Sequence, residues 1–352
     1  MFAQGPSSSC GQTSMGKIKI LLTGGTGFLG KQVLPLLREF AEVDVMSRSG
    51  KSEVRGDLTR WNAGLDLEAL KQKKYDIFIH LAGLYDLSAS HMDCFQQNIS
   101  ATGTALKIAR ALQIPVFINA SSVAAAINSP LKLVKPFDLN FSRPFPDPYS
   151  ESKALGEQMI LNQASHFRLC INMRLGVLVG DSKNGHIERI DGPYHAPQAL
   201  ERIRKFIESF PASFPLPGKK MGRLPLVPVD KAAEAVAGFV KWSQTTEARG
   251  YQSFHVTPKE GLVISDLYMK TLKQLFIPHK GVAFVNKIPK SVLTKISKWT
   301  VKFPEEQLNY LLMFPRYDSG PTRDVLGEDW CPEFEAYEKS FWRGYNEYIS
   351  NR

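Results

Sequence analysis

The chain has 352 residues, of which 43% are hydrophobic and 22% are charged, and its formal net charge is +10. This composition is typical of one large folded domain or two smaller ones. No apolar run reaches the eighteen or so residues that a membrane-spanning helix needs. The positive charge would attract an anionic ligand. Nucleic acid is not expected as a partner, because the chain has no zinc-ligand spacing, aromatic RNA-binding stretch or Lys/Arg block.

The N-terminal residues and the cysteines predict the cellular compartment of the protein. Residues 1–16 are rich in Gly, Ser and Gln and lack an apolar signal core, which predicts a disordered extension with Met15 as an alternative start. Cysteines stand far apart and without metal-ligand spacing at positions 10, 94, 170 and 331. We therefore expect reduced thiols, no metal site and a cytoplasmic protein.

Short apolar runs alternate with helical patterns over the first half of the chain. Buried strands are predicted at residues 18–24, 43–48, 76–83, 116–122 and 170–180, and helices at 30–40 and 99–112. Strands that alternate with helices predict an α/β fold with a doubly wound parallel sheet, the Rossmann-type arrangement.

The pattern changes after Gly180. An amphipathic helix is predicted at 195–210, a proline-rich loop at 211–230, a returning strand at 253–257 and proline-broken helices from Ile264 onward. We therefore expect a nucleotide-binding domain and a smaller, mostly helical substrate lobe. The domain would comprise residues 17–185 with 226–260 returning to it, and the lobe would comprise 186–225 and 261–352.

The stretch TGGTGFLG, residues 23–30, lies between a predicted strand and a predicted helix. A pyrophosphate at a helix N-terminus meets unpaired backbone N–H groups and the positive end of the helix dipole. Gly24 would permit the tight turn, Gly27 would let the backbone approach the phosphate, and Gly30 would let the helix pack on the strand. The stretch predicts a dinucleotide site.

Tyr149 and Lys153, in YSESK, stand four residues apart and would share one helix face. A nearby ammonium favours the phenolate and lowers the tyrosine pKa, so the phenol could exchange a proton with a carbonyl or alcohol oxygen. A serine hydroxyl beside that oxygen would orient it. The stretch NASSV, at the end of the fifth strand, supplies Ser122 for this role, with Ser121 as the alternative.

The end of the second strand predicts which nicotinamide cofactor is used. An acidic residue there would bind the ribose 2′-OH of NAD, whereas an arginine accommodates a 2′-phosphate. The stretch VDVMSRSGK carries Arg48 and Lys51 at the strand tip, and its only acid, Asp44, lies earlier. This pattern favours NADP(H).

Four motifs occur in an order that resembles the extended short-chain dehydrogenase/reductase family over about residues 17–260: TGGTGFLG, RGDLT, HLAG and YSESK. The resemblance implies that Asp57 touches the adenine, that residues 80–83 lie beside the cofactor ribose, and that Tyr149 and Lys153 are the catalytic pair. The full set of expected cofactor contacts is Gly24, Thr26, Gly27, Phe28, Leu29, Gly30, Arg48, Asp57, Leu58, Leu81, Ala82, Gly83, Tyr149 and Lys153.

Later segments resemble one branch of that family. LPLVPVD followed by KAAEAVAGFV, and YDSGPTRDVLG near the C-terminus, are similar to fatty acyl-CoA reductases and thioester-reductase domains. This resemblance implies NADPH-dependent reduction of a carbonyl or acyl thioester, on a small molecule or on a carrier- or CoA-linked acyl group. The alternatives are an alcohol or sterol dehydrogenase, a nucleotide-sugar epimerase or dehydratase, and a non-catalytic NADP(H)-binding sensor or scaffold.

Several further residues fit two alternative roles. Asn98 either holds helix geometry near the active site or caps a helix, and His80 is expected to be a packed strand-end residue rather than a base. Asp191 and His195 either line the pocket or belong to an ordinary loop. Residues 287–303, with five lysines among apolar side chains, either cover the pocket or touch a membrane surface. A homodimer is left open.

Overall fold

The computed structural model describes residues 17–49, 51–285 and 310–351. Its centre is a parallel sheet of seven strands in the order β12-β7-β5-β4-β1-β2-β3. The strands are β1 (Ile18–Thr23), β2 (Ala41–Ser47), β3 (Val54–Arg55), β4 (Ile77–His80), β5 (Val116–Ser122), β7 (Leu169–Leu175) and β12 (Gly250–Val256). The predicted α/β fold with a doubly wound parallel sheet is confirmed, including the returning strand near residue 255.

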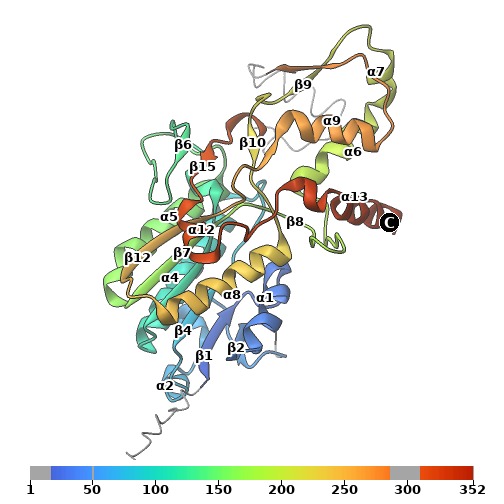
Figure 1. Cartoon of the computed structure of the whole chain (residues 1–352). Coiled ribbons are helices and arrows are strands. Elements are labelled where there is room, and N and C mark those ends of the chain that lie inside the picture. Colours follow the sequence, from blue (N-terminus) through green and yellow to red (C-terminus); the bar gives the residue numbers. More distant parts are fainter. Residues whose placement is uncertain (1–16, 50, 286–309, 352) are drawn as a thin grey trace, which may run out of the picture.

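Helices cover both faces of this sheet (Figure 1). One apolar core packs α1 (Phe28–Arg38) and α8 (Val229–Thr245) against one face. A second core packs α4 (Ala101–Ala111) and α5 (Pro148–Gln163) against the other face. Every residue of β4 and β7 is buried, including the polar residues His80, Asn172 and Arg174, so the mainly apolar sequences of these strands do not alternate as those of a half-exposed sheet would.

The strand order reverses between β1 and β4. Beyond β1 the chain builds outward to β2 and β3, and from β4 it builds in the opposite direction to β5, β7 and β12. At such a switch point the connecting helices leave on opposite faces, so a crevice forms outside the carboxyl ends of the strands. The glycine loop that follows β1 therefore lies at the place where open α/β sheets bind their ligands.

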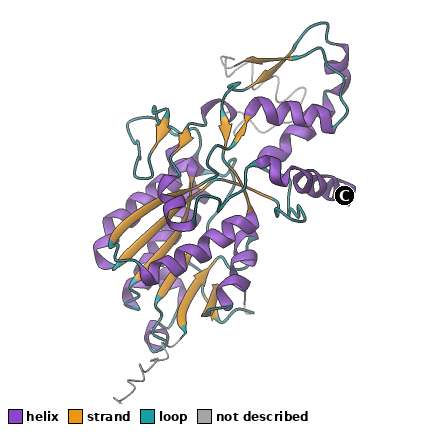
Figure 2. Ribbon diagram, in the orientation of Figure 1, coloured by secondary structure: helices purple, strands orange, loops and turns teal. Residues whose placement is uncertain are grey.

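A second region lies above the carboxyl end of the sheet and contains helices and short strand pairs (Figures 1 and 2). Its helices are α6 (His195–Arg202), α7 (Arg204–Ser209), α9 (Ile264–Gln274) and α13 (Phe334–Ser350). Its strand pairs are β8 (Val177–Val179) with β11 (Leu226–Pro228), β9 (Phe214–Pro217) with β14 (Val282–Val285), and β10 (Arg223–Leu224) with β13 (Leu262–Val263).

Three predicted elements differ in detail. The strand expected at 170–180 is divided at Gly176 into β7, in the main sheet, and β8, which pairs with β11. The helix expected at 195–210 is divided at Ile203 into α6 and α7. The loop expected at 211–230 contains β9, β10 and β11, because proline is tolerated in two-stranded pairs where its missing N–H faces away from the partner.

Short elements complete the described chain. They are α2 (Leu67–Lys71), α3 (His91–Cys94), β6 (Leu133–Val134), β15 (Arg316–Tyr317), α12 (Gly320–Leu326), a π-helical turn at Phe95–Ser100, and 3₁₀ turns at Trp61–Gly64, Val123–Ala126, Ala164–His166 and Gly192–Tyr194. Although α12 lies between α9 and α13 of the second region in sequence, its residues Val325 and Leu326 pack against the core that holds α8. The boundaries of the expected domains stay a prediction.

Two predicted segments, residues 1–16 and 287–303, lie outside the described residues. Within the part that the structure describes, no helix is long and apolar enough to cross a membrane. The same part contains no group of three or more His, Cys, Asp or Glu side chains suited to a metal ion.

Candidate active site

The loop between β1 and α1 turns back on itself immediately after the strand. Gly24 has a φ of +77°, in the left-handed region, and its carbonyl accepts the backbone N–H of Gly27 at 3.1 Å. A Cβ on Gly30 would lie only 2.1 Å from that same carbonyl oxygen. These two glycines are therefore required by the backbone: one for the turn and one for the close approach of helix to loop.

Gly27 differs from the other two glycines because the protein itself does not require it. It is the N-cap of α1 at a φ of −79°, which any residue adopts, and a Cβ there would meet nothing closer than Gly24 O at 3.4 Å. No side chain caps this helix and no acid lies in its first turn. The site therefore offers unpaired N–H groups and open space, which suits the phosphates of a dinucleotide.

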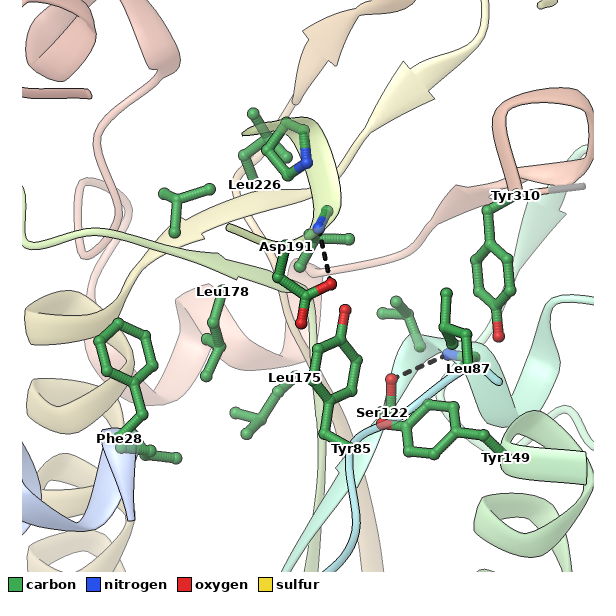
Figure 3. A pocket seen from close by; sticks show the side chains of 18 of the residues that line it. Phe28, Tyr85, Leu87, Ser122, Tyr149, Leu175, Leu178, Asp191, Leu226 and Tyr310 are labelled. Carbon is green, nitrogen blue, oxygen red and sulfur yellow. Dashed lines mark hydrogen bonds between the residues drawn. The ribbon is translucent and has the colours of Figure 1, made fainter. Parts of the chain in front are cut away.

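A cavity of about 550 Å³ extends from this loop into the second region (Figure 3). Of the predicted site residues, those that line it are Gly24, Gly27, Phe28, Leu29, Gly30, Leu81, Gly83, Ser122, Tyr149 and Lys153. Thr26, Arg48, Asp57, Leu58 and Ala82 are not among the lining residues. Apolar side chains from the second region, such as Leu224, Leu267 and Phe314, line the far part.

Ser122 and Tyr149 lie side by side in this cavity (Figure 3), and the Ser122 hydroxyl is close enough to the Tyr149 hydroxyl to influence its pKa. Ser122, at the end of β5, also accepts the backbone N–H of Ala124 at 3.2 Å. Ser121 lies next to it in the strand, but its hydroxyl donates to the buried carboxylate of Glu157 at 2.5 Å. Of the two serines that the sequence left open, Ser122 is the one in contact with Tyr149.

The protonation of Tyr149 and Lys153 is set mainly by burial. Burial raises the pKa of Tyr149 above its usual value of 10, and the Ser122 hydrogen bond opposes this. Burial also lowers the pKa of Lys153 to about 8, against the opposing charge of Glu157. Lys153 Nζ lies 5.9 Å from the centre of the Tyr149 ring and donates to Ala120 O at 3.4 Å. The pKa of Tyr149 is therefore raised, whereas the sequence predicted that Lys153 would lower it.

His80 and Asn98 hold the strand ends together. His80 is buried between the hydroxyls of Thr23, at 2.9 Å, and Thr102, at 3.2 Å. Burial, with the nearby charge of Lys153, lowers its pKa to about 3, so it is neutral and packed, as expected. Asn98 does not cap a helix. It lies in the π-helical turn, accepts from Leu84 N at 2.8 Å and donates to Ser152 at 2.9 Å, which joins the segment after β4 to α5.

Sequence reasoning missed Tyr85, Arg189 and Tyr310 as lining residues. The Tyr85 ring lies edge-on to Tyr149, with 5.4 Å between centroids. The Arg189 guanidinium stands 5.3 Å over the Tyr85 ring, donates to Tyr85 O at 2.9 Å and pairs with Asp191 at 2.8 Å. Asp191 lines the cavity, as one of its two readings predicted, whereas His195 is not among the lining residues. Tyr85 could have been identified from the sequence, because it lies only two residues after the HLAG motif.

Acidic and basic side chains near the second strand are also defined. The carboxylate of Asp44 accepts from Lys73 and from the Tyr75 hydroxyl, each at 2.6 Å. Arg48, at the tip of β2, is exposed. The pKa of Asp57 lies below its usual value. Burial raises this pKa, but hydrogen bonds from Thr59 and the charges of Arg48 and Arg60 together lower it by more. The strand tip therefore carries a basic side chain, and the Asp44 carboxylate is occupied by Lys73 and Tyr75.

The parallel sheet, with a glycine loop at its switch point, defines an NAD(P)-binding oxidoreductase of the extended short-chain dehydrogenase/reductase class. Residues 47–236, more than half of the chain, match the NAD-binding family model described as male sterility protein. The chain belongs to this family, whose branch includes thioester reductases. The class and the branch that the motifs predicted are thereby confirmed.

Individual relatives are more distant. A 2-alkyl-3-oxoalkanoate reductase of Stenotrophomonas maltophilia is 29% identical over 174 residues, which are 45% of this chain and 51% of that protein. The chain thus spans about half the length of this curated relative.

Solved structures share the fold at low identity. The terminal R domain of the myxalamid PKS-NRPS pathway matches with a TM-score of 0.71 at 18% identity, over 96% of this chain and 92% of that one. A thiolation-reductase di-domain from an archaeal non-ribosomal peptide synthetase gives 0.69 at 18%, over 95% and 76%. The UDP-Glc/GlcNAc 4-epimerase of Campylobacter jejuni gives 0.61 at 14%, over 94% and 98%.

Proposed function

We propose that this protein is an NADPH-dependent reductase of a carbonyl group or an acyl thioester, with Tyr149 as the proton donor. The observation that carries the proposal is that two neighbouring hydroxyls, those of Ser122 and Tyr149, line one cavity that begins at the glycine loop. A proton donor and an orienting hydroxyl at one point, next to a dinucleotide site, are what reduction of a carbonyl requires.

Different residues of the chain bind the cofactor, orient the carbonyl and donate the proton. The N-terminus of α1 would hold the pyrophosphate, and the nicotinamide would supply the hydride when the cofactor is bound. Ser122 donates a hydrogen bond to the carbonyl oxygen, and Tyr149 gives that oxygen its proton as negative charge develops on it. Because its pKa is raised, Tyr149 stays protonated at neutral pH and is ready to donate. With a thioester, loss of the thiol from the resulting hemithioacetal leaves an aldehyde.

The preference for NADPH rests on the tip of β2. Arg48 and Lys51 are exposed there, and the Asp44 carboxylate is occupied by Lys73 and Tyr75. A guanidinium binds a phosphate in a charge-assisted, bidentate manner. The ribose 2′-phosphate is the part of NADPH that Arg48 would bind.

The apolar wall of the cavity favours an acyl or alkyl substrate rather than a sugar. Its far part is lined by Leu224, Leu267 and Phe314, whose side chains offer no hydrogen bonds to a sugar ring. A carrier- or CoA-linked acyl group agrees with this surface and with the reductase domains that share the fold. In this proposal residues 186–225 and 261–352 form the substrate lobe.

A screen with the purified protein tests the proposal. NADPH oxidation is followed with acyl-thioesters, aldehydes and ketones, and with NADH in parallel. We expect turnover with at least one apolar carbonyl compound and a preference for NADPH. Tight NADPH binding without turnover on any member of the panel would instead identify a binding module.

A further inference from the structure

Two buried oxygen atoms close to Tyr149 have no hydrogen-bond partner among the described residues. They are Oδ2 of Asp147 and the hydroxyl of Tyr310, and both residues are only 8% exposed. Asp147 is the N-cap of α5, and its other oxygen accepts the backbone N–H of Ser150 at 2.8 Å. Buried polar atoms are seldom left unpaired, so each such atom calls for an explanation.

The two groups are neighbours, and one of them lines the cavity. Burial raises the pKa of Tyr310, and the charges of Asp147 and Tyr149 raise it further. Asp147 and Tyr310 are close enough for a hydrogen bond to affect both pKa values, but their geometry leaves both oxygens without a well-formed bond. Figure 3 shows the Tyr310 hydroxyl directed toward the side of the cavity that holds Tyr149.

The surroundings of Tyr310 make its hydroxyl conspicuous. Leu87, Leu311 and Phe314 line the same cavity and are apolar. In a ligand cavity, a small number of polar groups among apolar walls fixes the orientation of the ligand. A ligand hydroxyl satisfies Tyr310 in either arrangement, because it can donate when Tyr310 gives its proton to Asp147 and accept when Tyr310 turns to the ligand. A carboxylate ligand would be repelled by Asp147.

We propose that Tyr310 binds a hydroxyl group that the substrate carries near its reacting carbonyl, and that Asp147 is a positioning residue for Tyr310. This inference rests on the proposed function, since Ser122 and Tyr149 place the carbonyl. It goes further by assigning a substrate class: hydroxylated acyl or alkyl carbonyl compounds are preferred over plain ones.

The test compares matched substrates in the wild type and in Tyr310→Phe, which removes only the hydroxyl. Values of kcat/KM with NADPH are measured for octanal and for its 2-hydroxy and 3-hydroxy derivatives. The wild type should prefer one hydroxylated compound by about 3- to 10-fold, as one neutral hydrogen bond provides. Tyr310→Phe should lose this preference while its value for octanal changes little.

Two further variants test the positioning role of Asp147 and control for the loss of a buried tyrosine hydroxyl. Asp147→Asn retains the helix cap, since Asn caps as well as Asp, and should reduce the preference without abolishing turnover. Tyr337→Phe is the matched control: its buried hydroxyl donates to Leu226 O at 3.4 Å and Tyr337 does not line the cavity. It should keep the wild-type preference. A wild type with no preference, or equal losses on all three substrates in Tyr310→Phe, would overturn the subsite.

A binding measurement keeps the subsite testable apart from turnover. Calorimetry with the NADPH-bound protein compares 1-octanol with 1,2- and 1,3-octanediol. If no thioester, aldehyde or ketone is reduced, the proposed function fails, yet tighter binding of a diol that disappears in Tyr310→Phe would still support the subsite. Equal binding of alcohol and diols overturns the subsite whatever the activity.

Discussion

The two ends of the cavity are built from different materials. At the glycine-loop end the surface is mostly backbone: Gly24 and Gly30 fix a turn, and Gly27 leaves an opening at the start of α1. This backbone is held by a seven-stranded sheet that is buried on both faces. At the other end the surface consists of side chains, such as Tyr85 on the loop after β4 and Tyr310 on a helical stretch (Figure 3).

This difference has a consequence for mutation. A backbone-built surface is insensitive to most substitutions and fails only where a side chain fills the opening. A surface of side chains changes its chemistry with single substitutions while the fold is kept. We therefore expect cofactor binding to be fragile at a few glycines and basic residues, and substrate preference to be alterable throughout the second region.

The largest expected effect is at Tyr149, where the two ends meet. Tyr149→Phe removes only the hydroxyl, so folding and NADPH binding should survive. General acid catalysis contributes about 10²–10⁴-fold, and the hydride-transfer rate in single turnover at saturating NADPH should fall by that order. A variant within about threefold of the wild type, far short of that range, would exclude Tyr149 as the proton donor.

Neighbouring serines provide a sharper contrast on one strand. Ser122→Ala removes the hydroxyl that contacts Tyr149, and should lower the same single-turnover rate by about 10²-fold, the loss typical of one donor to a developing oxyanion. Ser121→Ala removes a bond to Glu157 instead. It should lower the melting temperature but leave hydride transfer nearly unchanged. The reverse pattern would assign the orienting role to Ser121.

Gly27→Val tests the backbone-built end. The backbone angles at this position suit valine and a Cβ meets no close atom, so the variant should fold. The side chain should instead enter the space reserved for phosphate, and the loss of a charge-assisted hydrogen bond there should weaken NADPH by about tenfold or more.

Titration calorimetry with NADPH measures this change. The control is Gly156→Ala in α5, where a Cβ would have Thr102 Oγ1 as its nearest neighbour at 3.9 Å and which lies outside the cavity. It should bind NADPH like the wild type. An undiminished affinity in folded Gly27→Val would remove the case for phosphate at this loop.

The difference between the two ends of the cavity also explains which features could be predicted from the sequence. The strand–glycine–helix unit and the pairs Tyr149/Lys153 and Ser122/Ser121 lie in short local motifs, so they could be located from spacing together with the family resemblance. The mainly apolar sequences of β4 and β7 indicated a sheet buried on both faces. Family motifs added the class, which the family match confirmed.

The rest depends on long-range contacts that leave no local pattern. Tyr310 reaches the neighbourhood of Asp147 from 163 positions later in the chain (310 − 147). The strands β9 and β10, within 211–230, depend on the partners β14 and β13, which lie later in the chain. Nor could spacing reveal that burial would dominate the pKa of Tyr149.

Arg48→Ala tests the cofactor preference with a smaller effect. Arg48 is exposed at the tip of β2, so the loss of its contact to a 2′-phosphate should weaken NADPH by roughly tenfold. NADH lacks that phosphate and should bind as before. Fluorescence titration with both cofactors gives the ratio of affinities, and Arg55→Ala, an exposed arginine at the end of β3, serves as control. Equal losses for both cofactors would show that Arg48 does not contact the phosphate.

The smallest expected effect is a pH dependence that arises at Lys153. Its pKa of about 8 lies below the usual 10.5, so the side chain is charged at lower pH and loses its proton as the pH rises through 8. If the ammonium supports reduction, kcat/KM, which reports groups of the free enzyme, should be level near neutrality and fall to about half near pH 8. Lys153→Met should be less active and should lack this fall. A decline of the same midpoint in Lys153→Met would assign it to another group, and a level profile in the wild type would show that the lysine charge is not needed.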